Sequence, residues 1–274
     1  MSHHTTPYPA QEGAMPSQRH ILPIAIVLIT ALAMLWHGPI NQLSDYHNFA
    51  DQRTWLGIEH AADVLSNLGF AAVAAYGLLI LRRQEAHPAF AAGIAGYRLF
   101  FGALALTALG SSWYHLAPDN ASLVFDRLPI ALACAGLLAA VWRETLGSPR
   151  WLVWLLGAAA IVSVAWWRLT DLEGAGDLRP YLLLQLLPLI LVPLLQHLAD
   201  RPRQERLMFA SAIGLYVLAK LCELADWQML DALALISGHT LKHVLASLAA
   251  LIVARQLASR VRHAGSSIPH PQAK

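Results

Sequence analysis

The sequence predicts an all-α integral membrane protein. Its 274 residues are 57% hydrophobic and only 13% charged, with a mean hydropathy of +0.47, whereas soluble domains carry about 25% charged residues. Apolar runs of membrane length recur along the whole chain. Because lipid offers the backbone no hydrogen-bond partner, segments that cross it form helices or closed barrels, and the short alternating segments of a barrel are not seen.

Eight apolar runs approach the ~20 residues that span a bilayer. They fall at 21–37, 60–81, 97–115, 126–143, 151–168, 180–197, 207–226 and 237–257. No clean small-residue cleavage site follows the first run, so we expect it to be retained. The predicted organisation is a disordered tail (1–20), an extra N-terminal helix (21–37), a polar non-cytoplasmic loop (38–59), a seven-helix membrane domain (60–257) and a disordered cytoplasmic tail (258–274).

The basic residues support eight spans. Apart from Lys220 and Lys242, which lie within spans, four basic residues fall on one side: Arg53, Arg127, Arg168 and Arg179. The other thirteen fall on the side shared by both termini: Arg19, Arg82, Arg83, Arg98, Arg143, Arg150, Arg201, Arg203, Arg206, Arg255, Arg260, Arg262 and Lys274. The positive-inside rule therefore predicts that both termini are cytoplasmic.

Composition also narrows the functional classes. A net charge of +2 without a basic stripe argues against nucleic-acid binding. The two cysteines, Cys134 and Cys222, lie in apolar runs and are expected to be small buried residues, with no disulfide between them. No feature of the sequence implies a protein partner.

Ionisable residues gather at one predicted depth, on the non-cytoplasmic side. Ser111 and His115 end the third span, Asp126 begins the fourth, and His239 and His243 begin the eighth. Each pair spaced i, i+4 shares one helix face. Polar residues inside a membrane are costly and usually functional, so we predict a site where these three spans meet.

Three imidazoles at one depth can hold zinc and leave a fourth position for water. Zinc lowers the pKa of such a water to about 7 and polarises a carbonyl. Asp126 would accept a proton from that water, and Ser111 would hydrogen-bond the metal-bound oxygen or a developing oxyanion. Paired histidines in helical bundles also bind haem, although two on one helix face suit a single small ion better.

Motifs in separate helices carry a resemblance to a known family. SSWYH (111–115), Asp126 in FDRLPI, and SGHTLKH (237–243) occur in that order, with ADVLSNLGF (62–70) and AKLCELADW (219–227) matching further core helices. Over residues 45–257 the chain resembles the alkaline ceramidase family, in the CREST superfamily of transmembrane hydrolases. The compact chain with short loops resembles a bacterial member, which would place the protein in the inner membrane with its site near the periplasm.

The resemblance implies a seven-helix core of CREST type with zinc held by His115, His239 and His243. It places Ser111 and Asp126 around the zinc water. The implied reaction is hydrolysis of the amide of ceramide, or of a similar membrane lipid, to sphingoid base and fatty acid. The extra first span is a departure from the family.

A second departure concerns calcium. Eukaryotic members carry an acidic calcium-binding segment before the first core helix. The equivalent stretch here offers a different spacing of oxygen ligands, Asp45, Asn48, Asp51, Glu59 and Asp63. Oxygen-rich loops bind Ca²⁺, but we expect a solvated polar loop.

Other polar residues have two interpretations each. His60 is either a partner of the site or an interface anchor. Glu223 and Asp226 either orient a ligating histidine or, for Glu223, pair with Lys220. Lys242 is expected to snorkel toward the headgroups, where a lipid phosphate is an alternative partner.

Three functions remain open from the sequence. The leading one is a zinc-dependent amidohydrolase of N-acyl lipids. The second is a receptor-like member of the same superfamily with weak hydrolase activity, for which we would expect a structured extramembrane domain or long tails. The third is a haem or quinone redox protein.

Overall fold

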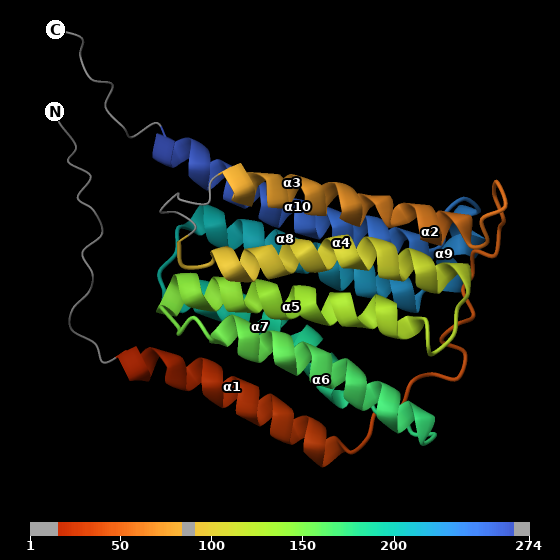
Figure 1. Cartoon of the computed structure of the whole chain (residues 1–274), viewed down its shortest axis with the longest axis horizontal. Helices are drawn as coiled ribbons and strands as arrows, with labels where there is room; N and C mark the ends of the chain where they lie inside the picture. Colours follow the sequence, from red (N-terminus) through yellow and green to blue (C-terminus); the bar gives the residue numbers. More distant parts are fainter. Residues whose placement is uncertain (1–15, 84–90, 266–274) are drawn as a thin grey trace, which may run out of the picture.

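The computed structural model describes residues 16–83 and 91–265 and is all-helical over those ranges, apart from two isolated β-bridges. The helices lie side by side in one bundle (Figure 1). They are α1 (Pro16–His37), α2 (Ala61–Ser66), α3 (Leu68–Arg83), α4 (Ile94–Leu116), α5 (Leu123–Leu146), α6 (Leu152–Leu172), α7 (Arg179–Leu198), α8 (Arg203–Leu224), α9 (Asp226–Leu233) and α10 (Gly238–Gly265).

Eight spans in the described part of the chain are long and apolar enough to cross a membrane. The second joins α2 to α3, and α9 is a short helix that does not span. Each predicted run overlaps one of these spans, so the all-α membrane fold is confirmed. In Figure 1, α1 begins and α10 ends at the same end of the bundle, as an even number of spans requires.

Two predicted tail boundaries are wrong. α1 begins at Pro16, so residues 16–20 are helical rather than part of a disordered tail. Proline is well suited to a first helical position, because its φ is preset and its missing N–H has no helical partner there. α10 continues to Gly265, because residues 254–262 are rich in Ala, Leu, Gln and Arg, which favour helix. Residues 1–15 and 266–274 lie outside the described part of the chain.

The extra helix α1 lies at the edge of the bundle, against α7 and α5 (Figure 1). Most of its apolar side chains are exposed, Trp36 to 94%, as expected for a lipid-facing helix. Near its start, Trp142 Nε1 donates a hydrogen bond to His20 Nδ1 at 3.0 Å. α1 is therefore an addition beside the remaining seven spans, as the sequence predicts.

Two glycines allow helices to touch through their backbones. A Cβ at Gly110 of α4 would lie 1.9 Å from the Phe125 carbonyl oxygen of α5, and one at Gly238 of α10 would lie 2.0 Å from the Cys222 carbonyl oxygen of α8. Small residues permit such close approach between membrane helices. The contacts fix the ends of α4, α5, α8 and α10 against one another, where the predicted site lies.

Gly110→Ala is expected to destabilise the protein, because its Cβ would force α4 away from α5. Overpacking of this kind costs about 1–3 kcal/mol. The matched control is Gly102→Ala, on the same helix, where nothing lies within 4 Å of the added Cβ. Thermal unfolding in detergent should show a lower midpoint for the first variant only. Equal midpoints would contradict the close contact.

Candidate metal centre

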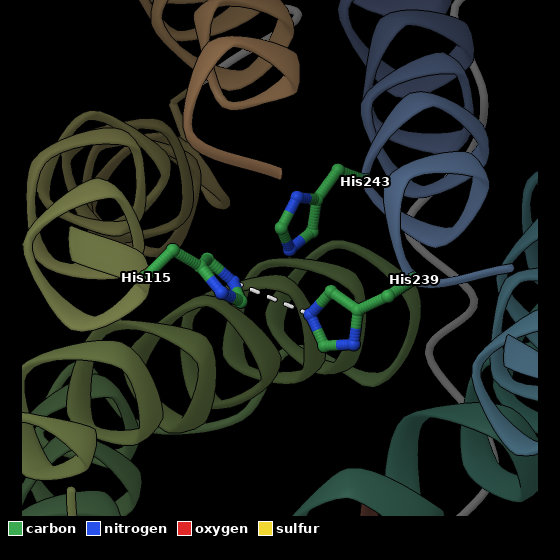
Figure 2. A group of neighbouring side chains, drawn as sticks. All are labelled: His115, His239 and His243. Carbon is green, nitrogen blue, oxygen red and sulfur yellow. Dashed lines mark hydrogen bonds between the residues drawn. The ribbon is translucent and has the colours of Figure 1, made fainter. Parts of the chain in front are cut away.

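The three predicted histidines converge at the end of the bundle that holds α9. His115 lies in the last turn of α4, and His239 and His243 lie in the first turns of α10. Figure 2 shows their rings facing one another, with centroids 4.8–5.1 Å apart. One nitrogen from each lies within 4.8 Å of the others, and all three residues are at most 5% exposed. The group can therefore bind a metal ion.

The start of α10 is fixed by hydrogen bonds to its backbone. Ser237 Oγ accepts from the Thr240 N–H at 3.0 Å, the usual N-cap arrangement. Asp226 Oδ1 accepts from the His239 N–H at 2.7 Å. Asp226 therefore positions a candidate ligand through its backbone rather than through its ring, which corrects one of the two interpretations made from the sequence.

The orientation of His243 is set from α2. Its Nδ1 lies 2.8 Å from Ser66 Oγ and 3.2 Å from the Asp63 carbonyl oxygen, and Ser66 Oγ itself donates to that carbonyl. These acceptors favour the tautomer with a proton on Nδ1, which leaves the Nε2 lone pair free. A hydrogen bond at the second ring nitrogen is the usual arrangement for a metal-binding histidine.

The spacing of the nitrogens fits a small tetrahedral ion. The Nε2 atoms of His115 and His239 are 3.3 Å apart. Two nitrogens each about 2.0–2.1 Å from a tetrahedral Zn²⁺ lie about 3.3 Å apart. His115 Nδ1 and Ser111 Oγ are buried without a hydrogen-bond partner among the described residues, so polar capacity at the centre is left unused by the chain.

Lys242 points into the centre, so the prediction that it snorkels outward is wrong. Its Nζ lies 2.8 Å from His239 Nε2 and 2.9 Å from Glu223 Oε1. Glu223 also pairs with Lys220, as one interpretation of the sequence had it. Because the ammonium occupies the lone pair of His239 Nε2, a metal ion could bind there only after Lys242 had turned away.

The structure brings Ser111 and Asp126 to the wall of one cavity, together with His243. Both are at least 95% buried. Ser111 follows Gly110, whose contact with Phe125 brings the hydroxyl to the helix that carries Asp126. All five residues predicted for the site therefore lie in one region, as their common depth in the sequence indicated.

The histidines are covered by residues 46–60, a segment in which the sequence singled out acidic residues and His60 but not Phe49. The ring of Phe49 packs edge-on against His115 and His239, with centroids 4.7 and 4.5 Å away. The Ala50 N–H donates to Asp226 Oδ2 at 2.9 Å. His60 does not join the three histidines; its Nδ1 bonds the Asp51 carbonyl oxygen at 2.9 Å, and its ring packs on Phe49. Phe49 thus shields the metal centre on this side.

The sequence predicts that the acidic residues of this region lie in a solvated loop, but two of them are buried. Asp51 and Asp63 have no exposed surface, while Asp45 and Glu59 are exposed. Arg53 binds Asp51 and the Leu235 carbonyl oxygen, at 2.5 and 2.7 Å. The Arg53 guanidinium holds the pKa of Asp51 below its ordinary value, against the opposing effect of burial.

The buried carboxylate of Asp51 is therefore paired with arginine. The buried carboxylate of Asp63 accepts a hydrogen bond from Thr240 Oγ1 through its Oδ1, at 2.5 Å. Among the described residues, the three histidines are the one group of His, Cys, Asp and Glu arranged to hold a metal ion. Cys134 and Cys222 are free thiols; Cys222 is buried, as predicted, whereas Cys134 is half-buried.

A cavity of about 160 Å³ leads from this centre into the bundle. Its polar end is lined by Ser111, Asp126, Glu223, Lys242 and His243, and its apolar end by Phe100, Leu104, Phe209, Ala250 and Val253. Along α10 the lining extends from Lys242 to Val253, which is about 16 Å at 1.5 Å per residue. That length is about half of the ~30 Å hydrocarbon core of a bilayer, the depth of one leaflet.

No protein-family model, curated protein or solved structure matches this chain. The fold and the site define its class as an all-helical membrane protein with a buried three-histidine group, one member of which, His243, lines the polar end of an apolar cavity. Any more particular assignment rests on the chemistry of that group and on the motif resemblance.

Removing two of the three histidines should abolish metal binding. We expect about one divalent ion per chain in detergent-purified protein, and none in His239→Ala/His243→Ala, by mass spectrometry of metal content. The matched control is His37→Ala/His197→Ala, which removes two exposed histidines. A folded wild-type protein without metal after incubation with Zn²⁺ would contradict the metal centre.

Ser66→Ala should weaken metal binding without removing a ligand, because the ring of His243 loses its orienting partner. Loss of such a hydrogen bond typically lowers metal affinity 10–100-fold. The comparison is Ser112→Ala, whose hydroxyl bonds only the Val64 carbonyl oxygen. Competition with a chelator would measure both affinities, and equal values would show that Ser66 has no orienting role.

Proposed function

We propose that this protein is a zinc-dependent transmembrane amidohydrolase that cleaves the amide bond of ceramide or a similar N-acyl lipid. The observation that carries the proposal is a group of three buried imidazoles, one of which, His243, lines the polar end of an apolar cavity one leaflet deep. The resemblance of the SSWYH, Asp126 and SGHTLKH motifs to the alkaline ceramidase family supports the same reaction.

The cavity suits an acyl chain. Each CH₂ removed from water contributes about 0.8 kcal/mol, and the apolar walls formed by α4, α8 and α10 offer no competing hydrogen bonds over most of their length. A chain lying along α10 would bring its amide carbonyl to the level of Ser111 and His243. Lipid substrates could enter from the membrane, while Phe49 keeps bulk water from the opposite side.

His115, His239 and His243 would hold the zinc ion, and the bond between His243 Nδ1 and Ser66 keeps the opposite nitrogen available. Bound zinc would supply Lewis-acid chemistry, polarising the carbonyl and acidifying a water molecule. The remaining steps belong to side chains of the chain itself, Asp126 and Ser111.

Asp126 accepts a proton from the attacking water and passes it to the amide nitrogen, which leaves as the amine. Ser111 Oγ, which lines the cavity together with Asp126, donates a hydrogen bond to the oxygen that develops negative charge. The water oxygen becomes part of the fatty acid carboxyl group and the C–N bond breaks, so water is added across the amide.

The excess of basic residues on the side of the termini supports a cytoplasmic location for both. In a bacterial inner membrane, the histidines at the opposite end of the bundle would then lie near the periplasmic face. Free fatty acid and amine would be released into the outer leaflet of that membrane.

The spacing of the histidines weighs against haem. Axial haem ligands lie on opposite faces of a porphyrin, and a 3.3 Å separation between the Nε2 atoms of His115 and His239 leaves no room for one between them. A receptor-like protein with weak hydrolase activity would share the same metal centre, so turnover decides between it and the enzyme.

Hydrolysis of fluorescent N-acyl sphingosines and other N-acyl amines by the zinc-loaded protein tests the proposal. Asp126→Asn should lower the rate about 10²–10⁴-fold, as loss of a general base does, and Ser111→Ala about 10²-fold or more, as loss of an oxyanion donor does. Both variants should retain zinc. Asp45→Asn, an exposed carboxylate in a loop, is the control.

Two results would count against the enzyme. Undiminished turnover by Asp126→Asn would remove the proposed base. No turnover of any N-acyl lipid by the zinc-loaded wild type would favour the receptor-like alternative.

A further inference from the structure

Two lysines share one carboxylate at the polar end of the cavity. Lys220 and Glu223 lie in the last turns of α8, and Lys242 lies in the second turn of α10. Glu223 Oε2 pairs with Lys220 Nζ and Glu223 Oε1 with Lys242 Nζ, and all three residues line the cavity. We call Lys220 and Lys242 the lysine pair.

The lysine pair has more donors than the chain has acceptors for them. An ammonium group carries three donors. Within the described residues, the ammonium of Lys220 bonds only Glu223, and that of Lys242 bonds Glu223 and His239 Nε2. The Lys220 side chain is 44% exposed, so its unused donors can be reached by a ligand.

Metal binding would increase this excess of ammonium donors over acceptors. The second acceptor of Lys242 is His239 Nε2, one of the three candidate ligand atoms. An ion at that atom would displace the ammonium and repel it, which leaves Lys242 with Glu223 alone. Two ammonium groups would then depend on one carboxylate beside a dication.

One further acidic group faces the cavity, so two carboxylates balance the two ammonium groups until a dication adds its charge. Asp126 on α5 is the remaining acidic residue of the lining, and it lies with Ser111 at the proposed reaction centre. Other polar residues of the lining include Tyr46, Tyr181, Gln185 and Tyr216, which are uncharged and therefore cannot balance the charge of an ammonium group. The Lys242 side chain is only 13% exposed. A buried cation without a full complement of acceptors is costly, and an anionic ligand lowers that cost.

We propose that the lysine pair binds a carboxylate on the amine portion of the substrate, which makes the preferred substrate an N-acyl amino acid or a lipid of that kind. The inference rests on the proposed function and narrows its substrate class. The acyl chain occupies the apolar end of the cavity, its carbonyl lies at the histidines, and the amine portion extends toward α8. Neutral ceramide leaves the lysine pair without a partner.

Binding to zinc-loaded protein tests this directly, by titration calorimetry at fixed detergent concentration. The probes are N-lauroylglycine, which is anionic, and N-lauroylethanolamine, which has the same chain and a neutral end. N-Lauroylglycine should bind at least about tenfold more tightly, the effect of one charge-assisted hydrogen bond. Lys220→Met should remove that advantage and leave binding of the neutral probe unchanged, and Lys220→Arg should largely restore it.

The control variant is Arg150→Met, which removes an exposed cation from the loop between α5 and α6 at the far end of the bundle (Figure 1). It should bind both probes as the wild type does. Equal affinities for the two probes, or an advantage that survives Lys220→Met, would overturn the proposal. Lauric acid, the product of hydrolysis, also carries a carboxylate, so its affinity tests whether the lysine pair binds the product. If its affinity falls in Lys220→Met while that of N-lauroylglycine does not, the lysine pair binds the product and the proposal fails.

Hydrolysis of the same two probes keeps the two proposals distinct. Lysine-dependent binding of N-lauroylglycine without cleavage would support the anion site and contradict the amidohydrolase. Equal cleavage of both probes, unaffected by Lys220→Met, would support the amidohydrolase and contradict the anion site.

Discussion

Backbone contact at two glycines is the constraint on which the rest of this structure depends. Helices in lipid gain little from apolar burial against each other, so close packing of small residues takes its place. Gly110 brings α4 onto α5, and Gly238 brings α10 onto α8. Each glycine directly precedes a residue of the site, Ser111 or His239. The packing that holds the bundle together therefore also sets the geometry of the candidate metal centre.

One carboxylate links the elements around that centre. The two oxygens of Asp226 accept from the backbone N–H groups of Ala50 and His239, so α9, the 46–60 segment and α10 are held together at one point. Because Asp226 binds backbone, it occupies neither ring nitrogen of His239. The same bond holds Phe49 over the histidines, which closes the centre on one side and leaves the cavity as its open side. This arrangement favours a substrate that arrives from lipid.

Hydropathy predicted every span, because a stretch of about 20 apolar residues is a strong pattern that tertiary contacts do not override. The i, i+4 spacing placed His239 and His243 on one face, and the order of spans placed His115 and Asp126 at the same depth. The roles of Phe49, Ser66 and Lys242 were missed. They depend on contacts such as Ala50 with Asp226 and Ser66 with His243, which join residues 176 and 177 positions apart, and no local pattern records such pairs.

The direction of Lys242 shows how much one such contact changes the chemistry of the site. If Lys242 snorkelled to the headgroups, the histidines and Asp126 would have no lysine charge beside them. A lysine that turns inward to Glu223 and His239 adds a cation beside the position proposed for a dication, at the polar end of a cavity whose deeper walls are apolar. Coulombic energies are larger in such surroundings than in water. The charge of the ligand, as well as the length of its acyl chain, must therefore enter any account of what this cavity binds.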